Sequence, residues 1–410
     1  MSEAMKKAMG HPESYNPKKP EIVNQIEDAI DKHGSEIYPE NFVLSYKGTP
    51  MPPEIKHYGP ATASYANEFA FFMDYAGQGY GFVFDGAWCM DRSYTIGNIL
   101  SGHAMEPAPI FSKEGADYVW KTAGFSFCHT FYANPGKGDY MTEQGMKDAI
   151  KYALCTLEQP VVIPMDDFFC GSIVIGYKDN GNTLVTFRYD PYFMDMKNNA
   201  RPRVEDVSDW YNKNTLLFIA GKRENELPIS EIYHLCLRRI RECLGENIRG
   251  AKQHYYDDWE AFLRMSVDDM IAAVRKTGAV PGGEHGPNDV HIRKEESDDE
   301  MWKFICRTHD STWCNMAERR FYVLQFFRQA KEYFPDHSKE FEGIADHFYG
   351  TNAIMGDGYG KEIGDPVNIE VFINPEIRAR MANFVKEFKE ADAIGLGMVD
   401  GLFRGMDVVE

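Results

Sequence analysis

Three short segments in the middle of the chain constrain its fold more than any other part of the sequence. Residues 159–165 read Gln-Pro-Val-Val-Ile-Pro-Met, and residues 171–181 read Gly-Ser-Ile-Val-Ile-Gly-Tyr-Lys-Asp-Asn-Gly. Short apolar runs rich in Val and Ile, bounded by Gly, Pro, Asn and Asp, predict β-strands. The Asp-Asn-Gly sequence predicts a tight turn into a third strand over 183–189, followed by Asp190-Pro191. We therefore expect three consecutive strands.

The pattern of the chain changes at residues 222–228, a charged Lys-Arg-Glu-Asn-Glu-Leu-Pro segment. Before this segment, an N-terminal helix, an intervening layer and a run of strands predict an α+β domain. After it, apolar residues recur at helical spacing, and the helices expected there are 229–245, 251–265, 267–277, 311–334, 338–355 and 375–393. We expect an N-terminal segment over 1–50, an α+β domain over 51–224 and an all-α helical domain over 225–410.

Within the first two segments, the expected helices are less regular. Helical spacing or a start signal predicts helices over 20–33, 58–76, 113–123 and 142–157, with Thr142 as N-cap of the last. Further strands are expected over 81–84, 125–131 and 215–220. Residues 86–112 contain Gly, Pro and Ser without clear periodicity, so we expect a long ordered loop there.

Composition excludes several classes of partner. The formal charge of −19 disfavours nucleic acid and anionic membranes, because both repel a strongly negative surface. The N-terminus has no apolar signal sequence, and no stretch approaches the length of a membrane span. Eight cysteines without a C-x-x-C pair are typical of reduced thiols, so the expected location is the cytoplasm.

Cofactor and metal motifs are weak. Asp166, Cys170 and His129 could supply ligands, but they lack a spacing such as H-x-x-x-H. The glycine-rich segments 77–81 and 358–361 lack the strand-then-helix context of a phosphate-binding loop. We expect neither a metal nor a cofactor. The Arg238-Arg239 and Arg319-Arg320 pairs lie in helical patterns, where we expect solvated or salt-bridged faces rather than anion sites.

Several phrases resemble a known family. Residues 158–163 (Glu-Gln-Pro-Val-Val-Ile) resemble a "G-x-P-V-I" phrase after a long helix, residues 173–177 (Ile-Val-Ile-Gly-Tyr) resemble "V-x-G-Y", and Asp190-Pro191 matches a strand end "D-P". Residues 57–61 (His-Tyr-Gly-Pro-Ala) resemble the opening phrase "Q-C-G-P-A". The chain thus resembles the papain-like domain of bacterial peptidases that trim double-glycine leaders, and more closely the butirosin biosynthesis protein H family. Residues 315–320 resemble that family's helical C-terminal domain, and the likeness covers roughly 55–395.

The resemblance implies a papain-like fold but also a loss of its chemistry. A papain-type catalyst needs a thiolate at a helix N-terminus, a His to accept its proton and a group to orient that His. The nucleophile position here is Tyr58, and the His position is Cys170 or Gly171. Only Asp190, in the orienting position, has the right type. In this register, peptidase chemistry is lost.

A displaced cysteine–histidine pair is the main alternative. Cys128 and His129 are adjacent, and neighbours on a strand point to opposite faces, so they cannot pair with each other. Cys128 could pair with His103, or Cys170 with His129 across neighbouring strands. For these two thiols and for Cys89, the competing interpretation is a buried, inert cysteine, since free cysteine is among the most buried residue types.

The inherited cleft of such a fold would lie between the first helix and the strands. Rings with a few polar groups are typical of sites for small organic ligands. Trp313 and Arg319 of the helical domain could roof the cleft. In this sequence the expected walls are Tyr58, Trp88, Cys89, His129, Asp166 and Cys170. The alternative interpretation is that these residues only pack the contact between the domains.

Three functions follow. The first is a catalytically degenerate papain-like protein that binds a small molecule or peptide in a biosynthetic or regulatory system. The second is a thioester-dependent acyltransferase or amide hydrolase like butirosin protein H, with Cys89, Cys128 or Cys170 as nucleophile and His103 or His129 as base. The third is an assembly protein that forms a homodimer through its aromatic-rich helices.

Overall fold

The chain has an α+β fold and divides into two compact units. A computed structural model describes residues 38–45, 69, 72–73, 92–102, 104–105, 113–126, 128–133, 140–164, 171–188, 203–213, 216–283, 295–353 and 359–406. One unit, called the sheet unit below, contains 1–46, 128–190 and 202–222, and the other, called the helical unit, contains 47–127, 191–201 and 223–410. Each unit is discontinuous in sequence, so the chain passes between them more than once.

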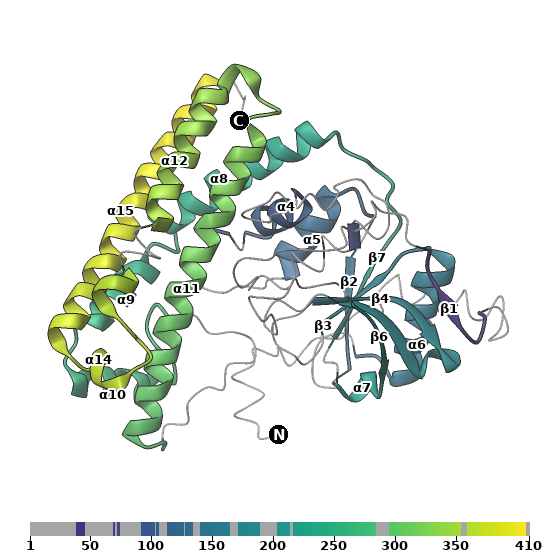
Figure 1. Cartoon of the computed structure of the whole chain (residues 1–410), viewed down its shortest axis with the longest axis horizontal. Coiled ribbons are helices and arrows are strands. Elements are labelled where there is room, and N and C mark those ends of the chain that lie inside the picture. Colours follow the sequence, from purple (N-terminus) through teal and green to yellow (C-terminus); the bar gives the residue numbers. More distant parts are fainter. Residues whose placement is uncertain are drawn as a thin grey trace. The chain divides into compact units, whose positions relative to one another are not determined.

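The sheet unit is built on an antiparallel sheet. Its described strands are β1 (Phe42–Val43), β2 (Cys128–Tyr132), β3 (Val161–Pro164), β4 (Gly171–Lys178), β5 (Thr183–Arg188), β6 (Arg203–Ser208) and β7 (Leu216–Ala220). The order across the sheet is β2-β7-β3-β4-β5-β6, and β1 pairs with the far end of β4. Strands β3 to β6 follow one another in both sequence and space, which is a meander (Figure 1).

The three strands expected from the sequence are confirmed as β3, β4 and β5. Pro164 pairs with Gly171 and Ser172 with Arg188, so the end of β3, the start of β4 and the end of β5 lie at one edge of the sheet. The turn from β4 to β5 uses Asp179 and Asn180 at φ of 50° and 55°, a left-handed conformation that Asn and Asp tolerate better than most residues. This is why the Asp-Asn-Gly signal was informative.

A helix packs in the same unit and ends in an unusual turn. Helix α6 (Glu143–Lys151) begins at Thr142, whose hydroxyl accepts from the backbone N–H of Gly145 at 3.2 Å, and the π-helical turn η1 (Tyr152–Thr156) continues it. The expected helix over 142–157 and its cap are confirmed. A short helix, α7 (Trp210–Lys213), precedes β7. In Figure 1, α6 lies beside the strands of the sheet.

Strand β6 was not expected from the sequence. It reads Arg-Val-Glu-Asp-Val-Ser and pairs only with β5 among the described strands. Charged residues on an outer strand hinder pairing with other chains, and they also weaken the apolar alternation by which a strand is recognised. The strand is therefore held by its pairing with β5 rather than by an apolar face of its own.

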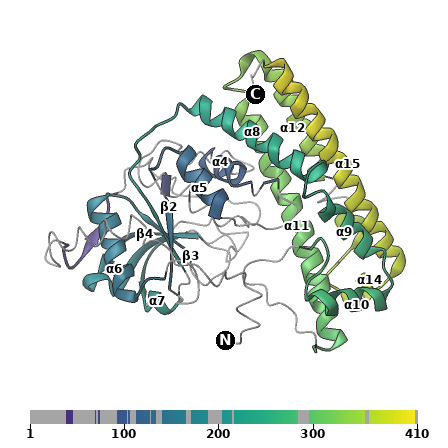
Figure 2. The same cartoon turned by 180° about the vertical axis from the view of Figure 1, so that it is seen from behind.

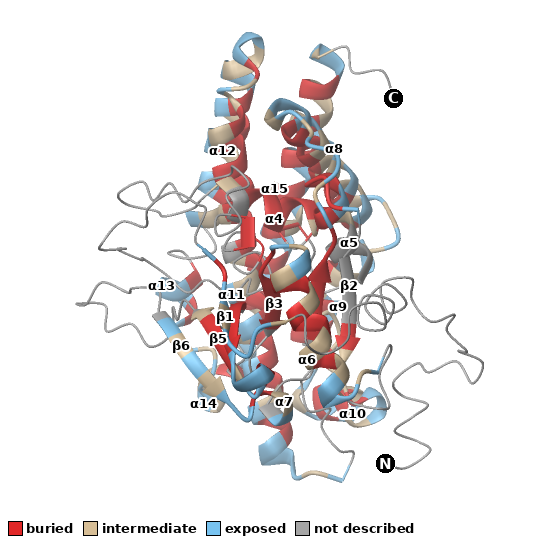
Figure 3. Ribbon diagram, turned by 90° about the vertical axis from the view of Figure 1, so that its right-hand side faces the viewer, coloured by how far each residue is buried: buried red, intermediate tan, exposed pale blue. Residues whose placement is uncertain are grey.

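The helical unit consists of long helices packed around an aromatic core. Its described helices are α4 (Arg92–Leu100), α5 (Lys113–Thr122), α8 (Ile229–Ile248), α9 (His254–Leu263), α10 (Val267–Thr277), α11 (Asp298–Ala330), α12 (Ser338–Ala353), α13 (Tyr359–Ile363), α14 (Ile369–Phe372) and α15 (Pro375–Gly405), with a 3-10 turn, η3 (Pro335–His337). Helix α11 packs against α12 and α4, whereas α15 packs against α9, α8 and α12 (Figure 2). Buried residues, red in Figure 3, run along α12, α15 and α8.

Helix α11 begins earlier than expected. The sequence predicted a start near Ser311, but the helix starts after Ser297, whose side chain accepts from the backbone N–H of Glu300. Ser297 and Glu300 have the S-x-x-E spacing of a capping box, followed by acidic residues that suit a helix N-terminus. The capping signal is therefore present in the sequence, upstream of the expected start at Ser311.

Helix α4 contradicts part of the expected loop over 86–112. Six consecutive residues, 95–100, are buried, so the helix has no polar face and shows no amphipathic period. It packs against α8 and α11. The segment 47–127 groups with the helical unit.

Candidate functional site

Most of the site expected from the sequence falls outside the described residues. Of its six residues, His129 is placed by its backbone in β2. The other five fall on residues that the structure does not describe: Tyr58, Trp88, Cys89, Asp166 and Cys170. The same applies to Asp190 and His103. The expected cleft therefore stays a prediction.

The strand order does test one of the displaced pairs. The sequence suggested that Cys170 could meet His129 across neighbouring strands. Gly171, the residue after Cys170, begins β4, and both β7 and β3 lie between β4 and β2. Three strand spacings separate the two strands, roughly 14 Å at about 4.8 Å each. The test covers the strands alone: β2 and β4 are not neighbours, whereas Cys170 and the side chain of His129 lie outside the described residues, so their pairing stays a prediction.

His129 itself lies in a paired strand. It is the one histidine in the strands that the structure describes, and its Cα partner is Ile219 of β7, while Cys128 is opposite Ala220. The side chains of Cys128 and His129 lie outside the described part of the structure, so the expectation that they do not pair with each other stays a prediction.

The two residues expected to roof the cleft are buried in the helical unit. Trp313 is 3% exposed and its ring stacks on that of Tyr359 with centroids 4.0 Å apart. Arg319 is also buried, on the same helix α11. Trp313 is therefore part of the aromatic core of this unit.

Three of the described thiols have raised pKa values, which makes them poor nucleophiles. Burial raises the pKa of Cys155, and it raises that of Cys306 to about 12 and that of Cys236 well above its ordinary value. A thiol must ionise to attack an acyl group. Cys155, Cys236 and Cys306 are therefore poor candidates for the nucleophile of a thioester mechanism.

The most developed polar cluster of the helical unit is an ion pair at its centre. Arg320 of α11 and Asp392 of α15 are both fully buried. The guanidinium donates from Nε to Asp392 Oδ1 at 2.8 Å, and from Nη2 to the second carboxylate oxygen. Tyr256 of α9 donates its hydroxyl to Asp392 Oδ2 at 2.7 Å and accepts from Arg320 Nη2 at 3.1 Å. Three helices thus converge on one pair of charges.

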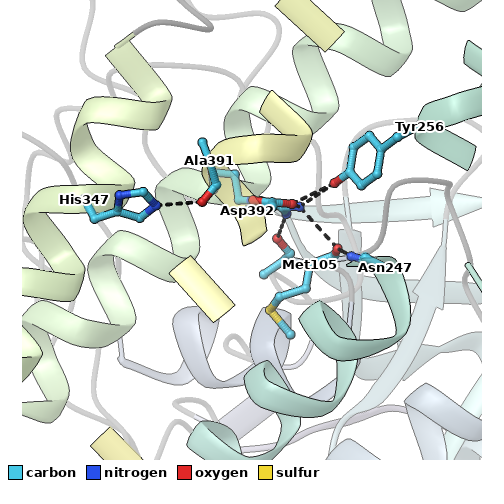
Figure 4. Close-up of polar contacts among 8 residues, drawn as sticks. Met105, Asn247, Tyr256, His347, Ala391 and Asp392 are labelled. Carbon is cyan, nitrogen blue, oxygen red and sulfur yellow. Dashed lines mark hydrogen bonds and ion pairs between the residues drawn. The ribbon is translucent and has the colours of Figure 1, made fainter. Parts of the chain in front are cut away.

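The remaining donors of Arg320 hold a turn of the chain. Nη1 donates to the carbonyl of Ala104 at 2.7 Å and Nη2 to that of Met105 at 3.4 Å. Asn247 of α8 also donates to the Met105 carbonyl. Figure 4 shows these groups converging, with His347 bonded at 2.8 Å to the neighbouring carbonyl of Ala391. Residues 104 and 105 are thereby tied to α8, α11 and α15.

The surroundings of Arg320 keep its guanidinium charged. Burial by itself would lower the pKa of Arg320, but Asp392 and Tyr256 raise that pKa by more, so the net shift is upward. Burial raises the pKa of Tyr256, and the adjacent Asp392 charge adds to that effect. A buried pair with its hydrogen-bonding capacity filled, and no exposed atom, has no free group to offer a substrate. Its role is structural.

A second buried polar cluster surrounds His309 on α11. Trp259 Nε1 donates to His309 Nδ1 at 3.1 Å, and His309 Nε2 lies 2.5 Å from the hydroxyl of Tyr359. The ring of Phe372 packs edge-on against the imidazole at 5.2 Å. Burial lowers the pKa of His309 to about 3. The imidazole is therefore neutral near pH 7.

A third cluster joins the N-terminal strand to the sheet. Tyr177 of β4 is buried, and its hydroxyl donates to the carbonyl of Pro39 at 2.9 Å and lies 3.6 Å from Cys155 Sγ in the π-helical turn. The ammonium of Lys151 lies over the Tyr177 ring, 5.8 Å from its centroid. Burial raises the pKa of Tyr177. The hydrogen bond from the Tyr177 hydroxyl to Pro39 thus attaches the segment 38–45 to β4.

The described residues contain neither a metal-ligand cluster nor a membrane-spanning helix. Within those ranges, no group of three or more His, Cys, Asp or Glu side chains is arranged to hold a metal ion. Among the described helices, none has an apolar stretch long enough to cross a bilayer.

Sequence reasoning missed the central ion pair. It assigned Arg319-Arg320 to a solvated or salt-bridged face; Arg320 is salt-bridged but fully buried, so the solvated alternative is wrong for it. A usable signal existed, because Asp392 interrupts the apolar stripe of α15 at a position where Phe388 and Leu396, four residues on either side, are buried. A buried carboxylate on such a stripe requires a buried cation as its partner, because an unpaired buried charge is costly.

Comparisons of the chain with protein-family models, with curated proteins and with solved structures yield no significant match.

Proposed function

We propose that the chain binds a small organic molecule or a peptide through its sheet unit and does not carry out papain-type peptide hydrolysis. The proposal takes up the resemblance to the butirosin protein H family and its papain-like fold, with the catalytic positions replaced. It includes a cytoplasmic location and excludes nucleic acid and membrane partners, in keeping with the acidic net charge.

The composition of β4 is the observation that carries the non-catalytic part. In the resembling family, the strand equivalent to β4 bears the histidine a few residues before Gly-Tyr. Here β4 begins with Gly171 and reads Gly-Ser-Ile-Val-Ile-Gly-Tyr-Lys. His129 is the nearest strand histidine in the described part of the sheet, and it lies three strands away. An imidazole so placed could not serve a thiol at the start of β4.

The topology also supports a binding surface at one edge of the sheet. The end of β3 and the start of β4 are paired, as are the end of β5 and the start of β6. The segment that connects β3 and β4, 165–170, reads Met-Asp-Asp-Phe-Phe-Cys and so includes Asp166 and Cys170 beside two aromatic rings. Residues that bind ligands are found disproportionately on connections held by a rigid scaffold.

A thermal-shift screen tests the binding proposal. The purified protein would be heated with a library of small organic acids, amines, amides and tripeptides. A ligand at 100 times its Kd should stabilise the protein by about 2.7 kcal/mol. Asp166→Asn and Cys170→Ser should weaken this stabilisation, whereas Cys314→Ser, an exposed thiol on α11, should leave it unchanged. A hit that resists both substitutions would place binding elsewhere, and an absence of hits would count against the proposal.

Cysteine labelling separates binding from the thioester-enzyme alternative. Iodoacetamide at pH 6.5, with peptide mass spectrometry, ranks the eight thiols by reactivity. Cys236 and Cys306, buried and with raised pKa values, provide slow internal standards. We expect Cys89, Cys128 and Cys170 to react without a strongly preferred member. One thiol reacting far faster than the rest would instead favour an acyltransferase or amide hydrolase, because such labelling reports thiolate character.

A further inference from the structure

The cluster around His309 fastens two short helices onto two long ones. His309 belongs to α11 and Trp259 to α9, whereas Tyr359 belongs to α13 and Phe372 to α14. Helices α13 and α14 lie in the connection between α12 and α15 and are five and four residues long. Helices this short are marginal by themselves. Their position must come from packing and from side-chain bonds such as the one between His309 and Tyr359.

The hydrogen bonds fix where the imidazole carries its proton. An indole N–H can only donate, so the bond from Trp259 makes Nδ1 an acceptor. The ring proton then resides on Nε2, which donates to the hydroxyl of Tyr359 at 2.5 Å. A second proton on Nδ1 would point directly at the indole N–H. Protonation of His309 therefore requires the Trp259 bond to break.

The surroundings offer no compensation for a positive charge. Burial alone accounts for the lowered pKa of the ring, with no charged group acting on it. From α9 and α14 the imidazole meets Trp259 and Phe372, neither of which titrates. Among the described contacts of the imidazole, the titratable group is Tyr359 of α13, and the charges nearest to that phenol are those of Asp310 and Cys314 on α11.

We propose that His309 is a pH-sensitive latch, which holds α13 and α14 against α9 and α11 when it is neutral and releases them when it is protonated. The closed form excludes the proton because Nδ1 is already occupied, and the open form exposes the ring to water. Acidification then favours the open form by mass action. The segment affected is 359–374, together with the face of α9 that bears Trp259.

The expected size follows from the two pKa values. The ordinary value is 6.5 and the value in the closed form is about 3. Lowering the pH from 7.5 to 5.0 should then raise the opening equilibrium constant by about 30-fold. Hydrogen exchange with mass spectrometry measures this constant once intrinsic exchange rates at each pH are divided out. Peptides from β4 and β5 in the same samples provide an internal reference.

Matched variants make the test specific. His309→Gln retains a donor and an acceptor but cannot titrate, so the 30-fold change should vanish in peptides covering 359–374. Tyr359→Phe keeps the imidazole, so opening should increase at both pH values while their ratio stays near 30. His254→Gln removes an exposed histidine at the start of α9 and should behave as the wild type. An equal pH response in wild type and His309→Gln would overturn the proposal.

A measurement on the unmodified protein guards against a variant that fails to fold. Nitrogen-15 NMR of the histidine side chains distinguishes the two neutral tautomers and the cation. We expect His309 to show the Nε2–H tautomer at pH 7.5 and to remain neutral in the closed form at pH 6. A cationic ring at pH 6 in a protein whose 359–374 peptides remain protected would contradict the latch, as would the Nδ1–H tautomer.

Discussion

Replacing Asp392 by Asn removes one negative charge from the centre of the helical unit while keeping the size of the side chain. The guanidinium of Arg320 then stays buried, with only neutral acceptors around it: the carbonyls of Ala104 and Met105, the hydroxyl of Tyr256 and the new amide oxygen. These acceptors satisfy its N–H groups, but they do not neutralise its charge. An uncompensated charge in a fully buried site is among the most destabilising changes known in protein interiors.

The magnitude can be worked from the contacts. Removing one partner of a buried ion pair costs about 3–5 kcal/mol, so Asp392→Asn and Arg320→Met together should cost about 6–10 kcal/mol if they were independent. The double variant Arg320→Met/Asp392→Asn combines the same two substitutions and leaves no buried charge, and its amide oxygen can still accept from the Tyr256 hydroxyl. Its main loss is the donor to the Ala104 carbonyl, about 1–3 kcal/mol, because Met105 keeps its bond from Asn247. The coupling energy should therefore exceed about 3 kcal/mol.

Urea unfolding followed by tryptophan fluorescence measures these values, since Trp259, Trp302 and Trp313 belong to the core of the same unit. The control is Asp257→Asn, which breaks a surface ion pair between Asp257 of α9 and Lys389 of α15. Such pairs contribute roughly 0–1 kcal/mol. A double variant whose loss equals the sum of the two single losses would refute the reasoning, because it would mean that the charges do not depend on each other.

Three further predictions concern local features. Ser297→Ala removes the N-cap of α11 and should cost about 1 kcal/mol of unfolding free energy in urea titrations. Gly395→Ala places a methyl group 2.7 Å from the ring of Phe348 and should lower the free energy of unfolding by about 1–3 kcal/mol. Gly397→Ala, on the same helix, has nothing within 4 Å of the new methyl group and should raise the free energy of unfolding by about 0.5–1 kcal/mol. Thermal denaturation of the two variants measures both changes. Tyr177→Phe removes one hydrogen bond to the 38–45 segment, worth about 0.5–1.5 kcal/mol, and should speed hydrogen exchange there while β4 stays protected.

The sequence predicted elements whose signals are local. The strands β3, β4 and β5 have apolar runs between turn residues, and α10 was predicted with its observed bounds, 267–277, because Ser266 caps it and Gly278 ends it in the left-handed conformation. Helix α15 was predicted to end at 393 but continues to Gly405. Its last twelve residues include Gly395, Gly397, Gly401 and Gly405, which lower helix propensity. Packing against α8 and α12 overrides that preference.

Relations between distant segments could not be predicted from the sequence. Arg320 lies 72 residues from Asp392 and 216 from Ala104, and no local pattern identifies such partners. The order of the strands in the sheet is equally hidden from local patterns, because β7 follows β6 in the chain but inserts between β2 and β3. A sequence pattern gives the face and the length of a strand, whereas its neighbours depend on which apolar faces the whole chain can bury together.

The strand order also narrows the chemistry that the sheet unit could support. With β7 and β3 between β2 and β4, the strand order disfavours a pair between His129 and the thiol that precedes Gly171, although each is a reasonable participant by residue type. A thioester mechanism would then have to pair Cys128 or Cys89 with a histidine from another part of the chain, or use Cys170 with His103. Fast iodoacetamide labelling confined to Cys170, and abolished by His129→Gln but not by His103→Gln, would favour the Cys170–His129 pair of the acyltransferase alternative. Labelling that responds to His103 alone would leave the topology intact and replace the binding proposal with an enzymatic one.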